Sequence, residues 1–586
     1  MNKMVARISM LTRPISMALA GYAVVSFAIA IWDIASGGFY LNLLGVRISS
    51  WDMHKPLRNG EICALLAFWI HDLGTHDDGT SWKWLDRWSG MIAAVLAILL
   101  VFVAIRFGTY AAGGADGYGY VSEAGLLASG QMLAPNRLAG LVPALGAAVA
   151  PLGYRLATTP EYLAPIYAPG LPLAMALSRR LGGSEAVFLV VPLLGGLAVW
   201  LTYALAARVA DRRTGLVAAA LLAFSPLFFF HSLVPMSDVP VTAWWLLAWV
   251  LALSSGSRTA VGSGLAASAA VLTRPNLVPL ALALAMIVAA RSGARRAVLF
   301  AVGVFPSIAA IALLYQHLYG SPFRSGYGAF DALFAFHYFI PNIRQFWSWS
   351  ADLHTPAILL GLLAPLTGRV RGGWSIVGFM VAVLACYVFY LPFFNWTFLR
   401  FLLPALPLLF ILDGSVAIVL LSRLPVASRG AGVFALCTLV PFWFIGKDDG
   451  LRFFEIEHGE RRFVTVGHAI GAIVPANAAV ISLIHSGSVR LYGERQSLRW
   501  DLIDPDRLDA AIRSLQEHNY VPYFLLEDWE EPRFRDRFGP SSHLGRIDWP
   551  PTAEYLGDAT IRLYSIEDRD RHLHGDRVLP RMIPAP

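Results

Sequence analysis

Asp116-Gly117-Tyr118-Gly119-Tyr120 is the stretch around which the chain is organised. It directly follows an apolar block at Met91–Tyr110 that is long enough to cross a lipid bilayer. A second acidic stretch, Ser237-Asp238-Val239-Pro240, lies between two later apolar blocks. We interpret both stretches as facing the same side of a membrane, with most of the remaining chain as the scaffold around them.

The composition is that of a membrane protein. Of the 586 residues, 56% are hydrophobic and 15% are charged, whereas a soluble chain carries about 25% charged residues. The net charge of +7 does not indicate nucleic acid binding, because much of it lies in short loops between apolar blocks. The three cysteines, Cys63, Cys386 and Cys437, all lie in apolar segments, so neither a disulfide framework nor a zinc pattern is predicted.

Apolar blocks of near-spanning length recur along the chain, and about thirteen spans are predicted. Each is expected to be a helix, because lipid offers an exposed backbone no hydrogen-bond partner. The predicted spans are Pro14–Ile34, Leu57–Asp72, Met91–Tyr110, Glu185–Ala207, Gly215–His231, Val239–Ser254, Val261–Thr273, Asn276–Ala290, Ala297–His317, Pro356–Thr367, Trp374–Leu391, Leu402–Leu421 and Ala431–Ile445. The predicted fold class is therefore an all-α polytopic membrane bundle.

Arginines set the expected orientation. The loops between spans alternate between two sets, and one set holds Arg208, Arg212, Arg213, Arg258, Arg291, Arg295, Arg296, Arg369, Arg371, Arg423 and Arg429. The positive-inside rule places that set, and with it the N-terminus, in the cytoplasm. The loops with Asp116 and Asp238 and the chain after Lys447 are then expected on the outer face of a cell inner (plasma) membrane.

The long outer segment 111–184 is expected to contain short helices at Tyr120–Gly130, Leu138–Val149 and Leu171–Leu181. The last two are too short to cross the bilayer comfortably, so we predict that they lie along its surface.

The chain after Lys447 changes to a charged, polar composition. Strands are expected at Ala478–Ile484, Val521–Glu527 and Thr560–Ile566, with a helix at Asp506–His518, which together indicate a small α/β domain on the outer face. The predicted division is an N-terminal membrane segment at 1–90, a catalytic membrane core at 91–447, the α/β domain at 448–567, and a disordered tail at 568–586.

Asp116 stands where a span meets a Gly-rich turn, and an aspartate in such a place is ordinarily a solvated turn former. Tyr118, Tyr120 and Glu123 crowd the same short stretch, which favours a functional interpretation. A carboxylate there can accept a proton from a hydroxyl group. Asp116 is therefore the first candidate catalytic residue, and the other three are candidate substrate contacts.

Asp238 is the second candidate catalytic acid. It follows Ser237 and opens the next span, with Pro240 in its first turn. Ser237 or Asp238 is expected to cap free amide groups of that helix. A cap does not exclude a functional role, so both interpretations stay open.

Three arginines are candidate substrate-binding residues: Arg274, Arg324 and Arg400. Arginine presents fixed donors that match phosphate oxygens, and ionisable residues at a membrane interface are functional candidates. Contact with lipid headgroups is the alternative. The expected outer histidines show no metal-ligand spacing. The chain also has no P-loop and no dinucleotide-binding glycine motif, so ATP-driven transport has no support.

Further motifs follow in a fixed order. They are Leu127-Ala128-Ser129-Gly130, Tyr167-Ala168-Pro169-Gly170-Leu171-Pro172, Leu181-Gly182-Gly183, Met236-Ser237-Asp238-Val239-Pro240 followed by Trp244 and Trp245, and Arg400 before Leu403-Pro404-Ala405-Leu406-Pro407. With Asp116, and over Met91 to about Ile445, they resemble the GT-C glycosyltransferases. These polyprenyl-phosphate-sugar-dependent enzymes include the protein O-mannosyltransferases and the bacterial lipid A aminoarabinose transferase.

The resemblance implies a membrane glycosyltransferase that moves a sugar from a polyprenyl-phosphate donor to a glycan, lipid or protein acceptor on the outer face, with inversion. It implies that Asp116 activates the acceptor and that Asp238 shapes the site. No cofactor is firmly implied, and a divalent metal stays an open alternative. A transporter or flippase of lipid-linked sugars is the alternative function, although paired halves are not visible in the sequence. A structural protein of the cell envelope is a third.

The sequence departs from the family pattern at three positions. Gly117 stands where relatives often have Glu, Gly119 where a basic residue is expected, and Ala168 where the aminoarabinose enzymes have Lys. Recognition of the donor phosphate is therefore expected from Arg274 or Arg400. In the C-terminal part, His485–Tyr492 resembles a loop of bacterial members, either on the acceptor side or as an ordinary turn between strands.

Overall fold

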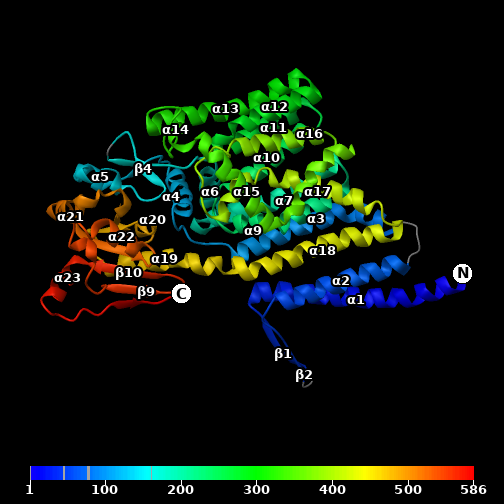
Figure 1. Ribbon diagram of the computed structural model, residues 1–586, viewed down its shortest axis with the longest axis horizontal. Coiled ribbons are helices and arrows are strands. Elements are labelled where there is room, and N and C mark those ends of the chain that lie inside the picture. Colours follow the sequence, from blue (N-terminus) through cyan, green and yellow to red (C-terminus); the bar gives the residue numbers. More distant parts are fainter. Residues whose placement is uncertain (1, 44–45, 75–79, 160, 586) are drawn as a thin grey trace.

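Long helices lie side by side through the larger part of the molecule, and a sheet with short helices forms the smaller part at one end (Figure 1). This computed structural model describes residues 2–43, 46–74, 80–159 and 161–585. Within those residues, five helices are long and apolar enough to cross a membrane: Pro14–Ser36, Trp82–Phe107, Ser184–Val209, Pro275–Ser292 and Ala294–Tyr319. Two bent pairs raise the number to seven if each pair is one span.

Every predicted span overlaps one or two observed helices, although Trp374–Leu391 extends beyond the end of α16 at Ala385 and the number of thirteen crossings stays a prediction. The helices of this part are α1 (Asn2–Ser36), α2 (His54–Gly74), α3 (Thr80–Phe107), η2 (Ser184–Leu189), α7 (Val190–Val209), α8 (Arg212–Ala223), α9 (Pro226–Leu233), α10 (Asp238–Ala252), α11 (Ser257–Thr273), η3 (Pro275–Leu277), α12 (Val278–Ser292), α13 (Ala294–Tyr319), η5 (Pro356–Thr367), α16 (Gly373–Ala385), η6 (Trp396–Leu402), α17 (Leu406–Leu421) and α18 (Val426–Leu451).

A Ser-Pro pair bends the chain between α8 and α9 by 58°. The hydroxyl of Ser225 accepts a hydrogen bond from the backbone N–H of Phe228, and Pro226 occupies the first turn of α9. This is the usual start of a helix, because Pro lacks the N–H that the first turn cannot pair. The second acidic stretch follows directly after α9.

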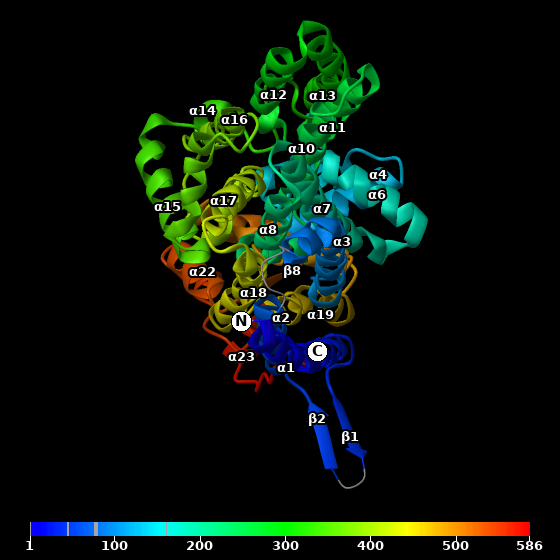
Figure 2. The ribbon, with the colours of Figure 1, turned by 90° about the vertical axis from the view of Figure 1, so that its right-hand side faces the viewer.

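Small residues let helices of the bundle approach closely. Gly264 of α11 lies against Gly303 of α13, and a side chain at Gly264 would collide with the backbone of Phe300. Such close contacts are the typical means of packing helices where water does not drive them together. Helices α1 and α2 pack on each other at the edge of the bundle, and the hairpin of β1 (Phe39–Leu43) and β2 (Val46–Ser50) projects from them (Figure 2).

The C-terminal part is a six-stranded mixed sheet in the order β11-β9-β10-β8-β6-β7. Its elements are η7 (Phe453–Glu455), α19 (Ile456–Ile473), β6 (Ala478–Ser482), α20 (Ser486–Leu491), β7 (Gln496–Arg499), η8 (Trp500–Leu502), η9 (Pro505–Arg507), α21 (Leu508–Glu517), β8 (Val521–Glu527), α22 (Glu530–Phe538), η10 (Leu544–Arg546), β9 (Ala553–Leu556), β10 (Thr560–Ser565), α23 (Ile566–Leu573) and β11 (Arg581–Ile583). The strands predicted near β6, β8 and β10 and the helix predicted near α21 are confirmed. Helix α20 between β6 and β7 replaces the expected loop.

The tail predicted to be disordered is ordered. Strand β11 pairs in parallel with β9, and Ile583 is buried in the sheet core. Asp568 accepts a hydrogen bond from Thr552 Oγ1 at 2.5 Å and so attaches α23 to the sheet. The prediction from charged composition was wrong because the open edge of β9 offers unpaired backbone groups to the tail.

The outer segment between α3 and η2 is irregular. Its elements are α4 (Asp116–Ala128), β3 (Ala134–Pro135), α5 (Arg137–Leu141), η1 (Pro143–Val149), β4 (Tyr154–Leu156), β5 (Tyr162–Pro165) and α6 (Gly170–Gly182). A second irregular segment, between α13 and η5, holds α14 (Phe330–Leu333), η4 (Phe336–Tyr338) and α15 (Phe339–His354). Strands β3, β5 and β4 form a small antiparallel sheet.

The segment Leu138–Val149 is not the membrane-surface helix that we predicted. Pro143 separates α5 from η1, and Leu138 and Val149 are buried in one cluster with Leu498 and Trp500 of the C-terminal part. Their apolar side chains therefore cover a distant part of the chain rather than lipid. The predicted domain division remains untested, but this cluster physically joins the outer segment to the C-terminal part (Figure 1).

Candidate active site

Asp116 is the first residue of α4 rather than part of the turn that we expected. Tyr167 donates its hydroxyl proton to Asp116 Oδ1 at 2.7 Å, and Arg400 of η6 donates to Asp116 Oδ2 at 3.0 Å. An aspartate in the first turn is also favoured by the helix dipole. Three segments that are far apart in the sequence therefore meet at this carboxylate.

Asp238 is the first residue of α10, and its side chain is 1% exposed. Arg274 Nη2 lies 2.7 Å from Asp238 Oδ1, and Arg400 Nε lies 4.0 Å from the same oxygen. Arg400 thus lies between the two acids that the sequence singled out. Both acids therefore line one site and share this arginine.

Ser237 does not cap α10, contrary to the expected helix cap, and neither does the side chain of Asp238. The Ser237 hydroxyl instead accepts hydrogen bonds from the Tyr120 hydroxyl at 2.8 Å and from Arg274 Nε at 3.0 Å. The cap interpretation fails because the Tyr120 hydroxyl and the charged Arg274 guanidinium donate to this oxygen instead. The bond from Tyr120 ties α4 to the start of α10.

The two acids differ in exposure, and this difference separates their roles. The Asp116 side chain is 25% exposed, whereas that of Asp238 is 1% exposed. Burial raises the pKa of Asp116, but the Arg400 guanidinium and the Tyr167 hydroxyl more than offset this effect and lower the pKa below its usual value. Asp116 is therefore an ionised carboxylate at the open edge of the site, and Asp238 is a sealed counter-ion for the arginines.

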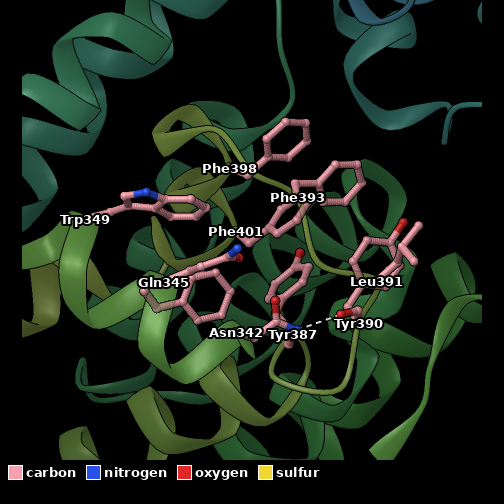
Figure 3. Close-up of a pocket in the computed structure, with 10 residues that line it drawn as sticks. Asn342, Gln345, Trp349, Tyr387, Tyr390, Leu391, Phe393, Phe398 and Phe401 are labelled. Atoms are coloured by element: carbon pink, nitrogen blue, oxygen red, sulfur yellow. Dashed lines mark hydrogen bonds between the residues drawn. The ribbon is translucent and has the colours of Figure 1, made fainter. Parts of the chain in front are cut away.

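An aromatic pocket adjoins the arginines. Arg274 donates to the Tyr387 hydroxyl at 3.0 Å, and the Arg400 guanidinium lies 4.8 Å from the Phe398 ring centroid. Figure 3 shows the pocket, which is lined by Asn342, Gln345, Phe346, Trp349, Tyr387, Tyr390, Leu391, Phe393, Phe398 and Phe401. Its free volume is only about 10 Å³, which is room for about one water molecule. A larger group enters this pocket only if the aromatic side chains move.

Gly119 explains one departure from the family pattern. A side chain at this position would collide with the ring of Tyr167. Tyr167 needs that space in order to reach Asp116. The close packing thus excludes a basic residue at position 119. Arg274, which directly precedes η3, and Arg400 of η6 supply the positive charge instead.

Three of the predicted contacts lie outside this cluster of charges. Tyr118 is buried, with its ring 5.7 Å from that of Tyr154. Glu123 is buried, no hydrogen bond to its Oε2 is found among the described residues, and burial raises its pKa well above the usual value. Arg324 is exposed, and no side-chain hydrogen bond or ion pair between it and the charge cluster is found among the described residues.

Sequence reasoning missed Tyr167 and Tyr387 as site residues. Tyr167 belongs to a motif that was recognised, but nothing in the motif indicated which group its hydroxyl contacts. Tyr387 carries no sequence signal, because it is one of several aromatic residues in an apolar segment. For a metal ion, the described ranges contain no group of three or more His, Cys, Asp or Glu side chains arranged as ligands.

The chain is similar to known proteins in sequence over part of its length and in structure over most of it. The sequence model of the family described as dolichyl-phosphate-mannose-protein mannosyltransferase matches residues 165–319. In structure, the chain is similar to ArnT from Cupriavidus metallidurans bound to undecaprenyl phosphate, with a TM-score of 0.50 and 13% identity over 81% of this chain and 97% of that chain. It is also similar to the oligosaccharyltransferase of Archaeoglobus fulgidus in complex with Zn and sulfate, with a TM-score of 0.50 and 14% identity over 81% and 73% of the two chains. No curated protein matches the chain in sequence.

Proposed function

We propose, from the premise that this chain is a member of the GT-C superfamily of glycosyltransferases, that it transfers a sugar from a polyprenyl-phosphate carrier to an acceptor on the outer face of the membrane. The family-model match over residues 165–319 and the structural similarity support the superfamily that the motifs indicated. The lipid-phosphate donor is inferred from the family description, which names dolichyl phosphate, and from the undecaprenyl phosphate bound to ArnT.

The observation that carries the proposal is the shared position of Arg400 between Asp116 and Asp238. Transfer from a phosphate carrier needs positive charge where the phosphate leaves, and it needs a carboxylate where the acceptor hydroxyl attacks. Arg274 and Arg400 offer the first, and the exposed edge of Asp116 offers the second. Asp238 keeps both guanidinium groups in place.

The proposed reaction is a single displacement. The acceptor oxygen forms a bond to the anomeric carbon as the bond from that carbon to the phosphate oxygen breaks, so the configuration inverts. The hydroxyl proton passes to Asp116, and the carrier phosphate departs with its electron pair against Arg274 and Arg400. The aromatic pocket beside them is where the sugar ring or the first carrier units would lie after the side chains rearrange.

The lowered pKa of Asp116 makes it a weak base in the empty site. A donor phosphate would compete with Asp116 for the Arg400 guanidinium, because arginine binds phosphate and carboxylate with the same donors. Donor binding therefore releases the carboxylate and raises its basicity. The proton transfers late, once the attacking oxygen has become acidic through its new bond.

Two measurements test the proposal with purified protein in liposomes. The first uses radiolabelled undecaprenyl-phosphate mannose as the probe donor and an extract of envelope glycans, lipids and proteins as the acceptor pool. We expect label to move from the carrier to an acceptor in the wild type, to be lost about 10²-fold or more in Asp116→Asn, and to be retained in the exposed control Asp331→Asn.

The second measurement does not depend on the identity of the sugar. Undecaprenyl phosphate alone should raise the thermal unfolding midpoint of the wild type, and this shift should shrink in Arg274→Gln. Absence of both binding and transfer contradicts the proposal. If label crosses to the other leaflet while remaining on the carrier, the chain is instead a transporter of lipid-linked sugars.

A further inference from the structure

The C-terminal part directly contacts the residues that precede Asp116. The backbone N–H of Ala112 donates to the Tyr492 hydroxyl at 2.8 Å. The next residue, Gly113, lies so close to the ring of Phe463 that a side chain at Gly113 would overlap it. The entry to α4 is therefore held by α19 and by the residue that follows α20.

Helix α20 also contacts α4 itself. Gly487 lies flat against the Tyr118 ring, and a side chain at Gly487 would collide with that ring. Tyr118 is buried and follows Asp116 by two positions in the same helix. Any displacement of α20 towards α4 would therefore be passed to the first turn that carries Asp116.

Tyr118 and Tyr120 hold α4 from nearly opposite sides. Side chains two residues apart on an α-helix point in directions that differ by roughly 200° around the helix axis. Tyr120 is hydrogen-bonded to Ser237 in the membrane part, whereas Tyr118 packs on Gly487 of the C-terminal part. Helix α4 thus lies between the two parts, with one tyrosine directed to each.

A buried network fixes α20 in the C-terminal part. His485, which is 0% exposed, lies with Nε2 3.1 Å from Glu527 Oε1 and with Nδ1 3.2 Å from Ser488 Oγ. Arg462 of α19 donates to the same Glu527 oxygen at 2.9 Å. On the other side, Ser486 Oγ accepts a hydrogen bond from the backbone N–H of Leu152 in the outer segment. Helix α20 is thereby fixed to its own sheet and to the outer segment at once.

We infer that the C-terminal part positions the candidate catalytic carboxylate, with Gly487, Tyr492 and Tyr118 as positioning residues that act on Asp116 through α4. This inference rests on the proposed function for its catalytic readout. It gives Tyr118 a contact with the protein in place of the substrate contact expected from the sequence. The arginines lie outside α4 and α20, so this interface does not contact them directly.

The decisive variant is Gly487→Ala. The added methyl group forces Tyr118 and the start of α4 to shift, and a small misplacement of a catalytic group can reduce the rate about 100-fold. We expect kcat for sugar transfer to fall about tenfold to 100-fold, while KM for the donor and binding of undecaprenyl phosphate change less than twofold. The matched control is Gly459→Ala in α19, where an added Cβ would make only an ordinary contact with Asp558 at 3.4 Å.

A double variant separates positioning from general damage. In a Tyr118→Ala background the ring that the added methyl group would strike is absent, so Gly487→Ala should cost no further activity there. If Gly487→Ala lowers kcat equally in both backgrounds, the Tyr118 contact is not the route and the inference is overturned.

A third measurement does not depend on catalytic activity. Tyr492→Phe removes the acceptor of the Ala112 N–H, so hydrogen exchange of backbone amides in 112–119 should accelerate, whereas the control Tyr520→Phe should leave it unchanged. If wild type transfers no sugar, the proposed function fails, and the exchange experiment still decides the positioning. Unchanged exchange in both Tyr492→Phe and Gly487→Ala overturns the inference.

Discussion

Two carboxylates in this molecule are surrounded by similar partners but differ in access. Asp116 contacts Arg400 and Tyr167, and its side chain is 25% exposed. Glu527 contacts Arg462 and His485, and its side chain is 3% exposed. The comparison teaches that partners alone do not identify a reactive group: the open carboxylate can meet a substrate, and the sealed one can only hold the fold together.

The sealed network has a defined charge state. Burial would raise the pKa of Glu527, but the hydrogen bond from His485 and the Arg462 guanidinium lower it to about 2. Burial lowers the pKa of His485, so the ring is neutral. His485 then donates from Nε2 to Glu527. The constellation of Ser488, His485 and Glu527 has the partners of a hydrolytic triad, but each side chain is buried, so substrate cannot reach it.

The largest expected effect comes from removing the shared cation of the open site. Arg400→Gln should lower sugar transfer about 10³-fold, because the departing phosphate loses a fixed positive charge. The pKa of Asp116 should rise at the same time, so the acid side of the residual pH–rate profile should move to higher pH. The measurement is kcat/KM as a function of pH, with the exposed Arg344→Gln as the control. Unchanged transfer would remove Arg400 from the proposed mechanism.

The matching change in the sealed network should act mainly on stability. Glu527→Gln removes the buried negative charge opposite Arg462 and should lower the free energy of unfolding by about 3 kcal/mol at pH 7. Below the unfolding temperature, any loss of transfer per folded molecule should be far smaller than in Arg400→Gln, because Glu527 acts on Asp116 only through the contact of α20 with Tyr118. Thermal unfolding and transfer rates measured on the same preparation check this prediction.

The loss of stability caused by Glu527→Gln should become smaller as the pH falls. A carboxyl group with a lowered pKa stabilises the fold above its unfolded-state pKa of 4.5, and this stabilisation is lost as the pH falls towards about 2. The difference in unfolding free energy between wild type and variant should therefore be constant near neutrality and shrink below pH 4.5. A difference that grows on acidification would contradict an ionised Glu527.

Gly119→Ala should have an intermediate effect on the open site. The methyl group would push the Tyr167 ring away from α4, and overpacking of this kind costs about 1–3 kcal/mol. We expect a roughly tenfold loss of transfer, with a smaller change in donor KM, because the hydrogen bond to Asp116 weakens. Tyr167→Phe, which removes that bond without overpacking, is the control and should reproduce part of the loss.

The smallest effect is expected from Arg324→Gln. Its side chain is exposed and apart from the charge cluster, so transfer and donor KM should change less than twofold. A loss greater than tenfold would show that the segment around Arg324 reaches the donor during the reaction. In that case the exposure of a side chain in the protein without substrate would not show whether that side chain contacts the donor.

Much of the membrane fold could be predicted, because lipid requires long apolar helices and the apolar blocks mark them. Short apolar runs within an otherwise polar part of the chain likewise located the strands β6, β8 and β10. The errors share one cause. Leu138–Val149 and the residues around Ile583 pack on partners distant in the sequence, and local composition carries no information on such partners.

The site was predictable to the level of residue type. The two acids and Arg274 and Arg400 were identified because charges beside apolar blocks are conspicuous. The different contacts of Tyr118 and Tyr120 could not be predicted. Two tyrosines so close in the sequence differ only in the side of the helix on which they lie. Tyr167 and Tyr387 reach the site through folding alone.

The hydrogen bond between Ala112 and Tyr492 has a consequence for biosynthesis. These residues are 380 positions apart, and ribosomes add about 5–20 residues per second. Roughly 20 to 80 seconds therefore separate the emergence of the two partners, and for that time the entry to α4 lacks its final restraint. Under the proposed function, we expect a nascent chain already inserted in the membrane to gain full activity only after its C-terminal part has been synthesised and folded.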